Sequence, residues 1–247
     1  MKKIILLTFI ATTLLQAQTI TVALAANVSY AIKSLETAFK QQHPKTDLRI
    51  IIGGSGKLTA QIKNGAPYDI FMAANMRYPQ ALYNEKMAIT APKIYAKGSL
   101  AILSKKERDF SQGIAIVTDK SIHRIALANP KSAPYGKAAL EALKNAKLYD
   151  KVRKKAIYGE SIAQALSYTI RAADLGFIAK SALYSPKLQH FKEGKNWIEV
   201  NPKLYHAIDQ GVVILKYADK NKAAKEFYLF LFSPKAKAIF KKYGYNF

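Results

Sequence analysis

The chain has 247 residues, half of them hydrophobic, and contains no cysteine, which excludes disulfide bonds and a lipid-anchored cysteine. Its formal net charge is +23. A net charge this positive can indicate a nucleic-acid or other polyanion partner. The lysines are scattered along the chain and form no tail, so we interpret the charge mainly as a solvated surface and expect no nucleic-acid partner.

Residues 1–17 have the pattern of a secretory signal peptide. Lys2 and Lys3 form its charged region, an apolar run extends from Ile4 to Leu15, and Ala17 offers a small residue for cleavage. The apolar run is too short for a comfortable membrane span. The sequence therefore predicts an exported protein of a bacterial periplasm.

Strand and helix patterns alternate along the rest of the chain, which predicts an α/β fold. Helices are expected after Asn27, from Ser55, over 77–85, from Pro134, and from Ser161 to Ala172. The pattern restarts near residue 125, so we expect two lobes with a ligand cleft between them. The predicted strands or extended segments are 19–25, 48–52, 70–72, 100–103, 114–117, 125–128, 157–158, 175–179 and one within 207–215.

The most specific local motif surrounds Ser55. A strand, a Gly53-Gly54 turn and a helix start follow one another there, and the unpaired N–H groups of a helix start attract an anion. The nucleophile elbow of hydrolases requires a glycine where Lys57 stands. The phosphate-binding loop of nucleoside triphosphatases fails as well, because Ile51 and Leu58 occupy required positions. Ser55 is therefore interpreted as a hydrogen-bond donor to an anion, the alternative being that it only caps the helix.

Catalytic equipment is missing from the sequence, so we expect no enzyme, no cofactor and no protein–metal ligand. The four histidines show no metal-ligand spacing and are expected on the surface: His43, His123, His190 and His206. What recurs instead is a strand, a short polar turn and a helix start, at Asn27, Ser55, Tyr135 and Ile162. Four helix starts of this kind can converge on one anion.

Six segments, in this order and spacing, resemble the periplasmic molybdate-binding proteins of bacterial ABC transporters, which are type II periplasmic solute-binding proteins. The resemblance covers nearly all of the chain after residue 17. Each match alone is modest, and their order carries the signal. The segments are 20–27, 58–74 with Gly65-Ala66-Pro67-Tyr68-Asp69, 129–136 with Pro134-Tyr135-Gly136, 159–162 with 175–178, and 230–245.

The resemblance implies two lobes joined by two crossover segments, lobe one being 18–98 with 208–247 and lobe two 99–207. It implies a monomer that binds molybdate or tungstate as the intact oxyanion and delivers it to a membrane permease. Ser55 would donate its hydroxyl and its N–H, and Asn27 an amide N–H. Tyr135 and Ile162 fall where relatives use backbone N–H groups, and Ala26 is an additional candidate.

One position departs from the well-known relatives. They place a ligand-contacting tyrosine where this chain has Ala179. A second branch of the family pairs an asparagine in the first loop with a tyrosine in the third, as Asn27 and Tyr135 do here. We therefore expect the Tyr135 phenol to supply the missing donor, the alternative being that only its backbone contributes.

A site made of donors suits a dianion whose oxygens only accept hydrogen bonds, whereas protonated phosphate needs an acceptor. We expect the nearest carboxylate, Glu160, to point away from the site. Exclusion of sulfate depends on cavity size, which the sequence does not give. The open alternatives are a binding protein for another oxyanion such as sulfate or for a small organic acid, a hydrolase, and a polyanion-binding adhesin.

Overall fold

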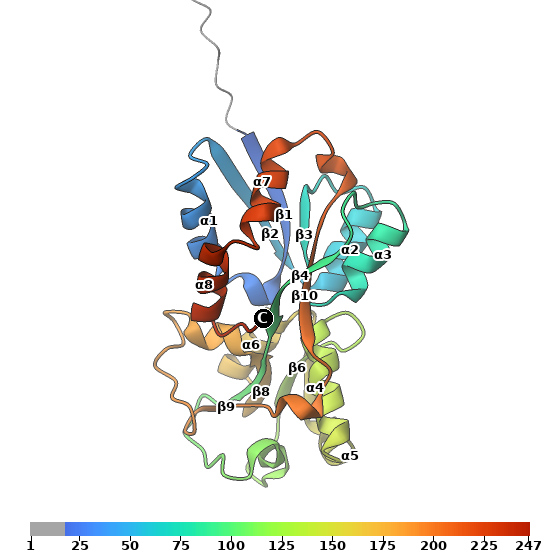
Figure 1. Cartoon of the computed structure of the whole chain (residues 1–247). Coiled ribbons are helices and arrows are strands. Elements are labelled where there is room, and N and C mark those ends of the chain that lie inside the picture. The colour runs from blue at the N-terminus through green and yellow to red at the C-terminus, as the bar shows by residue number, and fades with distance from the viewer. Residues whose placement is uncertain (1–17) are drawn as a thin grey trace, which may run out of the picture.

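The computed structural model describes residues 18–247, and the predicted signal peptide lies outside these residues. The described chain forms two five-stranded sheets with helices packed on both, and it passes from one sheet to the other twice (Figure 1). The predicted α/β class with two lobes is confirmed. We call the sheet that contains the first strand, with its helices, the first lobe, and the other sheet with its helices the second lobe.

The first sheet has the strand order β2-β1-β3-β10-β4, and β1 runs parallel to β2 and β3. Strand β10 enters from the second lobe and is antiparallel to both of its neighbours. The strands are β1 (Gln18–Ala25), β2 (Thr46–Gly53), β3 (Ile70–Met72), β4 (Lys93–Gly98) and β10 (Ile208–Ile214).

The second sheet repeats this arrangement in the order β7-β6-β8-β5-β9. Strand β6 is parallel to β7 and β8, while β5 enters from the first lobe and is antiparallel to β8 and β9. The strands are β5 (Leu100–Leu103), β6 (Ile125–Ala128), β7 (Ala156–Gly159), β8 (Leu175–Ala179) and β9 (Trp197–Glu199).

Alternation along the strands gives each sheet two buried faces, because successive side chains of a strand point to opposite sides. In β1, Val22 and Leu24 pack with α1, α7 and α8, whereas Ala23 packs with α2 and α3 on the other face. The helices of the first lobe are α1 (Ile32–Lys40), α2 (Ser55–Lys63), α3 (Arg77–Asn84), α7 (Lys222–Phe230) and α8 (Pro234–Lys242). Those of the second lobe are α4 (Pro134–Asn145), α5 (Tyr149–Val152) and α6 (Ile162–Arg171).

The two crossings between the lobes run side by side. Only Ser99 separates β4 from β5, and Ile208 at the start of β10 pairs with Gly98 at the end of β4. Any group held near Gly98 therefore lies at the junction of the two lobes. No helix within residues 18–247 combines the length and the apolar character that crossing a membrane requires.

Two local predictions were wrong. Residues 114–117 were expected to be extended, but they lie in a 3-10 helix (Gly113–Thr118) that buries Ile116 and Val117 in the core of the second lobe without pairing to a strand. Asn27 was expected to cap the first helix, but it lies in a separate 3-10 turn (Ala26–Val28), and α1 begins only at Ile32. In both segments the short hydrogen bonds of a 3-10 helix pair backbone N–H and C=O groups that a strand or a longer helix would otherwise pair.

Candidate ligand-binding site

The predicted site residues all follow the carboxyl ends of parallel strands. Ala26 and Asn27 follow β1, Ser55 follows β2, Tyr135 follows β6, and Ile162 follows β7. Ligands of open α/β sheets bind at this edge. The two edges meet, since Ala26 and Ala74 of the first lobe share one buried cluster with residues of the second lobe that include Tyr135 and Ile162.

The Ser55 hydroxyl is free to donate a hydrogen bond to a ligand. Its side chain is 1% exposed, and its Oγ accepts the backbone N–H of Ala74 at 3.0 Å. Because that bond uses an oxygen lone pair, the hydroxyl proton remains free for an acceptor. Ser55 is the first residue of α2, so its own N–H has no acceptor within the helix. The preceding Gly54 is the residue at the N-cap, and the Ser55 side chain does not cap the helix.

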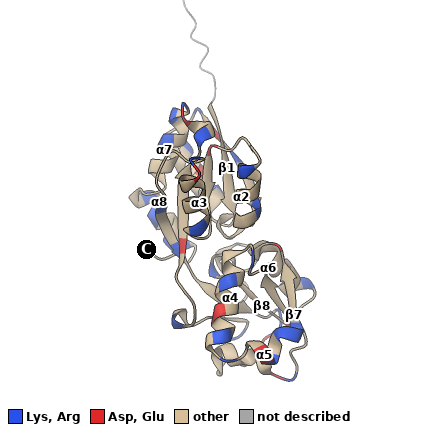
Figure 2. Ribbon diagram, turned by 90° about the vertical axis from the view of Figure 1, so that its right-hand side faces the viewer, with Lys and Arg blue, Asp and Glu red and all other residues tan. Residues whose placement is uncertain are grey.

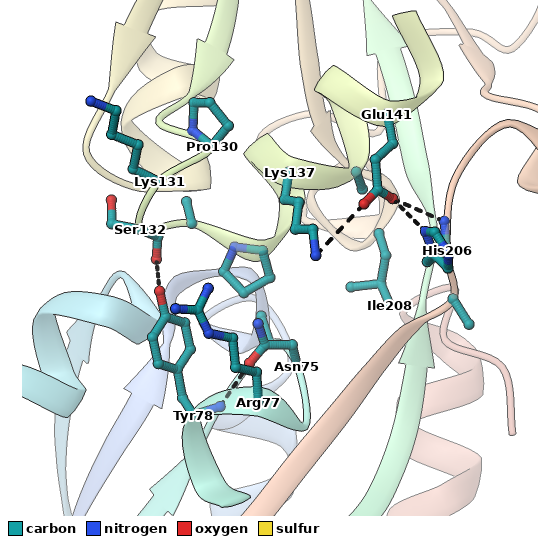
Figure 3. A pocket seen from close by; sticks show the side chains of 15 residues that line it. Asn75, Arg77, Tyr78, Pro130, Lys131, Ser132, Lys137, Glu141, His206 and Ile208 are labelled. Carbon is teal, nitrogen blue, oxygen red and sulfur yellow. Dashed lines mark hydrogen bonds and ion pairs between the residues drawn. The ribbon is translucent and has the colours of Figure 1, made fainter. Parts of the chain in front are cut away.

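The glycines beside Ser55 leave room for two loops of the second lobe to pack closely against this turn. A Cβ at Gly56 would lie 2.8 Å from the Ser132 carbonyl oxygen, and one at Gly54 would lie 3.0 Å from that of Glu160. The N–H of Gly56 donates to the Ser132 carbonyl at 3.2 Å, and the Tyr78 hydroxyl donates to the same oxygen at 3.0 Å (Figure 3). The turn around Ser55 is therefore held against two loops of the second lobe.

The Tyr135 phenol is buried without a partner. The residue is 1% exposed, and its hydroxyl makes no hydrogen bond within the described chain. A Cβ at Gly98 would lie 2.1 Å from this hydroxyl, which places it at the junction of the crossings. Burial raises the pKa of the Tyr135 phenol well above its ordinary value. The phenol therefore stays protonated and remains a donor at neutral pH.

Asn27 is held by residues from distant parts of the chain. Its amide nitrogen donates to Gln210 Oε1 at 2.7 Å and to the Tyr245 hydroxyl at 3.0 Å, while Oδ1 has no partner. Its backbone carbonyl accepts the Tyr245 hydroxyl at 2.8 Å and Ser181 Oγ, from the second lobe, at 2.9 Å. The amide N–H groups that were expected to face the ligand are therefore engaged by the protein in this structure.

The other two candidate positions are apolar and offer only their backbone. Ile162 is the first residue of α6, after Ser161, whose Oγ caps the helix by accepting the N–H of Gln164 at 3.3 Å. Ala26 opens the 3-10 turn that packs against α6. Ala179, which stands where the well-known relatives have a tyrosine, ends β8 and is buried. The hydroxyl that reaches Asn27 from this part of the chain belongs to Ser181.

Carboxylates are kept away from these residues. The Glu160 side chain is exposed and lies 3.7 Å from the Lys57 ammonium, as expected from the sequence. Asp69, which is 5% exposed, precedes β3 and accepts from Thr21 and Asn221 at the opposite end of the strand. No group of three potential metal ligands occurs in the same part of the chain. The buried polar side chains at the meeting edges are all neutral.

A family model described as bacterial extracellular solute-binding protein matches residues 20–246. The chain belongs to this family. It is 34% identical to the molybdate-binding protein ModA of Azotobacter vinelandii over 94% of this chain and 91% of that one, and 34% identical to ModA of Rhodobacter capsulatus over 90% and 86%. The solved structure of the Azotobacter vinelandii periplasmic molybdate-binding protein superposes with a TM-score of 0.85 at 32% identity, covering 92% of this chain and 99% of that one. The resemblance and the two-lobed fold predicted from the sequence are confirmed.

Sequence reasoning missed several residues that shape the site of this solute-binding protein. Strand β10 is apolar except for Asp209 and Gln210, so the polar residue Gln210 was a sign of a functional position that the sequence offered. Tyr245 and Gly98 offered none, because their roles depend on the loops that they meet in space. Ser132 was likewise hidden, since it contributes its backbone carbonyl and not its side chain.

Proposed function

We propose that this protein captures molybdate outside the cytoplasm and delivers it to the membrane permease of an ABC transporter. Two relatives at 34% identity are named molybdate-binding proteins, and the match covers nine-tenths of this chain. Transport proteins of this kind bind a ligand without converting it, which agrees with a site whose buried side chains are neutral. We further propose that residues 1–17 direct export to the periplasm and that the protein acts as a monomer.

The observation that carries this proposal is the pair of free hydroxyl donors. The Ser55 hydroxyl proton and the unpartnered Tyr135 phenol lie at the two edges that meet between the lobes. Molybdate is a tetrahedral dianion whose oxygens only accept hydrogen bonds, so neutral donors suit it and a carboxylate would repel it. We assign ligand contacts to Ser55 and Tyr135 through hydroxyl and backbone, and to Asn27, Ile162 and Ala26.

Asn27 can serve the ligand in two ways. Its backbone N–H can donate directly, or its amide can rotate away from Gln210 and Tyr245 when an anion offers better acceptors. The unpartnered Oδ1 supports the second route, because the present orientation leaves one buried acceptor unsatisfied. The division into lobe one (18–98 and 208–247) and lobe two (99–207) remains part of this proposal, with the anion held where the two crossings meet.

A ligand panel tests the function. Calorimetry and thermal shift with molybdate, tungstate, sulfate, phosphate and small carboxylates should show tight binding of the first two only. Tungstate has nearly the size of molybdate and should bind comparably, whereas hydrogenphosphate brings a proton into a site made mainly of hydrogen-bond donors. A ligand that binds only the folded protein raises its melting temperature with concentration. An unchanged melting temperature with both molybdate and tungstate contradicts the proposal. A rise in melting temperature with sulfate alone would identify sulfate, and not molybdate, as the ligand.

A further inference from the structure

Two cavities lie beside the candidate site, and their charges differ. The first, of about 160 Å³, lies between the loop before α3 and the start of α4, and it reaches Ala74 and Ala133 beside Ser55 and Tyr135. The second, of about 400 Å³, lies between the start of α2 and the loop before α6, and it reaches Gly54 and Ser161. Neither lining includes Ser55 or Tyr135, so each cavity borders the buried site without containing it.

The first cavity carries an excess of positive charge. Arg77, Lys131 and Lys137 line it, against the single carboxylate of Glu141 (Figure 3). That carboxylate is already engaged, since it accepts the His206 N–H at 3.1 Å and lies 3.7 Å from the Lys137 ammonium. Among residues 18–247, no carboxylate comes within 4.0 Å of the charged groups of Arg77 or Lys131, and both side chains are exposed.

The second cavity is balanced. Its single cation, Lys57, lies 3.7 Å from its single carboxylate, Glu160. The total charge of the protein does not explain this difference, because lysine and arginine are spread over both lobes (Figure 2). The asymmetry is local and comes from which cations have a nearby carboxylate.

We propose that Arg77 and Lys131 form an encounter site for a small dianion at the first cavity, and that this opening is the route to the buried site. This inference rests on the proposed function. Arg77 comes from the first lobe and Lys131 from the second, so both walls of the opening attract the anion. A cavity lined by one sign of charge raises the rate of encounter, and neutral donors deeper inside then hold the ligand.

Such a site acts on association and not on dissociation. An unpaired cation at an exposed mouth attracts the incoming dianion over a Debye length, which is about 30 Å at 0.01 M salt and about 3 Å at 1 M. Replacing one such cation should therefore slow association about twofold to fourfold at low salt, an order-of-magnitude estimate from the Coulomb interaction of a unit charge with a dianion. The effect should fade as salt is added, and the dissociation rate should stay within about twofold of the wild type.

Stopped-flow measurement of molybdate binding, followed by intrinsic protein fluorescence, tests the route. The variants are Arg77→Gln, Lys131→Gln and the double variant, at low salt and at 0.5 M sodium chloride. Lys57→Gln makes the same charge change at the second cavity. Lys225→Gln makes it on α7, which packs on the other face of the first sheet from α3. We expect slower association for the first two variants, the largest loss for the double variant, and little change for the two controls.

Three outcomes would overturn the encounter site. They are an equal or larger loss of association rate in Lys57→Gln, a loss that persists undiminished at 0.5 M salt, and a change confined to dissociation. The proposed function fails separately, through absence of molybdate and tungstate binding to the wild-type protein in calorimetry. If the wild type binds molybdate and the double variant associates at an unaltered rate, the encounter site is refuted and the proposed function is not.

Discussion

The Tyr245 hydroxyl donates to the Asn27 carbonyl at 2.8 Å and accepts the Asn27 side-chain amide at 3.0 Å, although 218 positions separate the two residues. The C-terminal segment thus holds both the backbone and the side chain of the first loop. Asn27 also bonds Gln210 on the returning crossover strand and Ser181 of the second lobe, so this loop is tied to the crossover, to the second lobe and to the C-terminal segment.

Removing the Tyr245 hydroxyl should loosen the first loop. Tyr245→Phe loses two buried hydrogen bonds to Asn27, so we expect a decrease of about 1–3 kcal/mol in the free energy of unfolding and weaker molybdate binding. Tyr243→Phe is the matched control, because its hydroxyl lies 3.1 Å from Ser34 Oγ on α1 and does not contact Asn27. Urea unfolding and calorimetry check both variants. Equal dissociation constants for the two would show that Tyr245 does not position the loop for the ligand.

Ser55→Ala should weaken binding strongly and also lower the free energy of unfolding by about 1–3 kcal/mol, because the buried Ala74 N–H loses its acceptor. The hydroxyl proton is free for an anion, and hydrogen bonds to charged groups are worth about 1.5–3 kcal/mol, which is about a tenfold to hundredfold change in affinity. His123→Ala serves as a comparison, since His123 is exposed and lies just before the start of β6, away from the meeting edges. Calorimetry that finds the two variants equally damaging would remove Ser55 from the site.

Tyr135→Phe should separate binding from stability. The hydroxyl has no partner in the ligand-free protein, so its removal should leave the free energy of unfolding unchanged or raise it by about 1 kcal/mol. Molybdate affinity should fall, mostly through faster release, because contacts made across a closed interface act chiefly on dissociation. Unchanged affinity and release would mean that only the Tyr135 backbone contributes, and Ala179→Tyr would then test where the missing donor lies.

Gly98→Ala should act through Tyr135. The new Cβ would lie 2.1 Å from the Tyr135 hydroxyl and 3.0 Å from Gln210 Nε2, so the phenol must move. We expect a large loss of affinity in the single variant and a smaller additional loss when Tyr135→Phe is already present. A double-mutant cycle by calorimetry measures this coupling. Strictly additive losses would show that Gly98 affects binding independently of the phenol.

Tyr78→Phe should speed ligand release. The Tyr78 hydroxyl donates across the lobes to the Ser132 carbonyl at 3.0 Å, and a neutral hydrogen bond of this kind is worth about 1 kcal/mol, or about fivefold in rate. Tyr83→Phe is the control, because Tyr83 lies on the same helix and is exposed. Stopped-flow dissociation measurements compare the two. An unaltered release rate in Tyr78→Phe would mean that this contact does not stabilise the closed arrangement.

The sequence by itself determined the alternation of strands and helices over much of the chain and several boundaries, but it did not predict β4, β9, α5 or α7. Ile70–Met72, Leu100–Leu103, Ile125–Ala128 and Leu175–Ala179 were predicted residue by residue, and Ser161 caps its helix as expected. These features depend on residues a few positions apart, through apolar runs, caps and turn residues. The same local evidence was misleading at 114–117, where an apolar run is buried by a 3-10 helix and not by a strand.

Only the tertiary structure decided what each loop meets. The glycines near Ser55 leave room for a close approach, and the groups that approach are the carbonyls of Ser132 and Glu160. The ligand role of Ser55, Asn27, Tyr135, Ile162 and Ala26 stays a prediction. Gln210 and Tyr245 reach Asn27 from 183 and 218 positions away because the chain crosses twice between the lobes. Periodicity and capping report only on near neighbours in sequence, whereas these contacts are set by how two folded lobes pack.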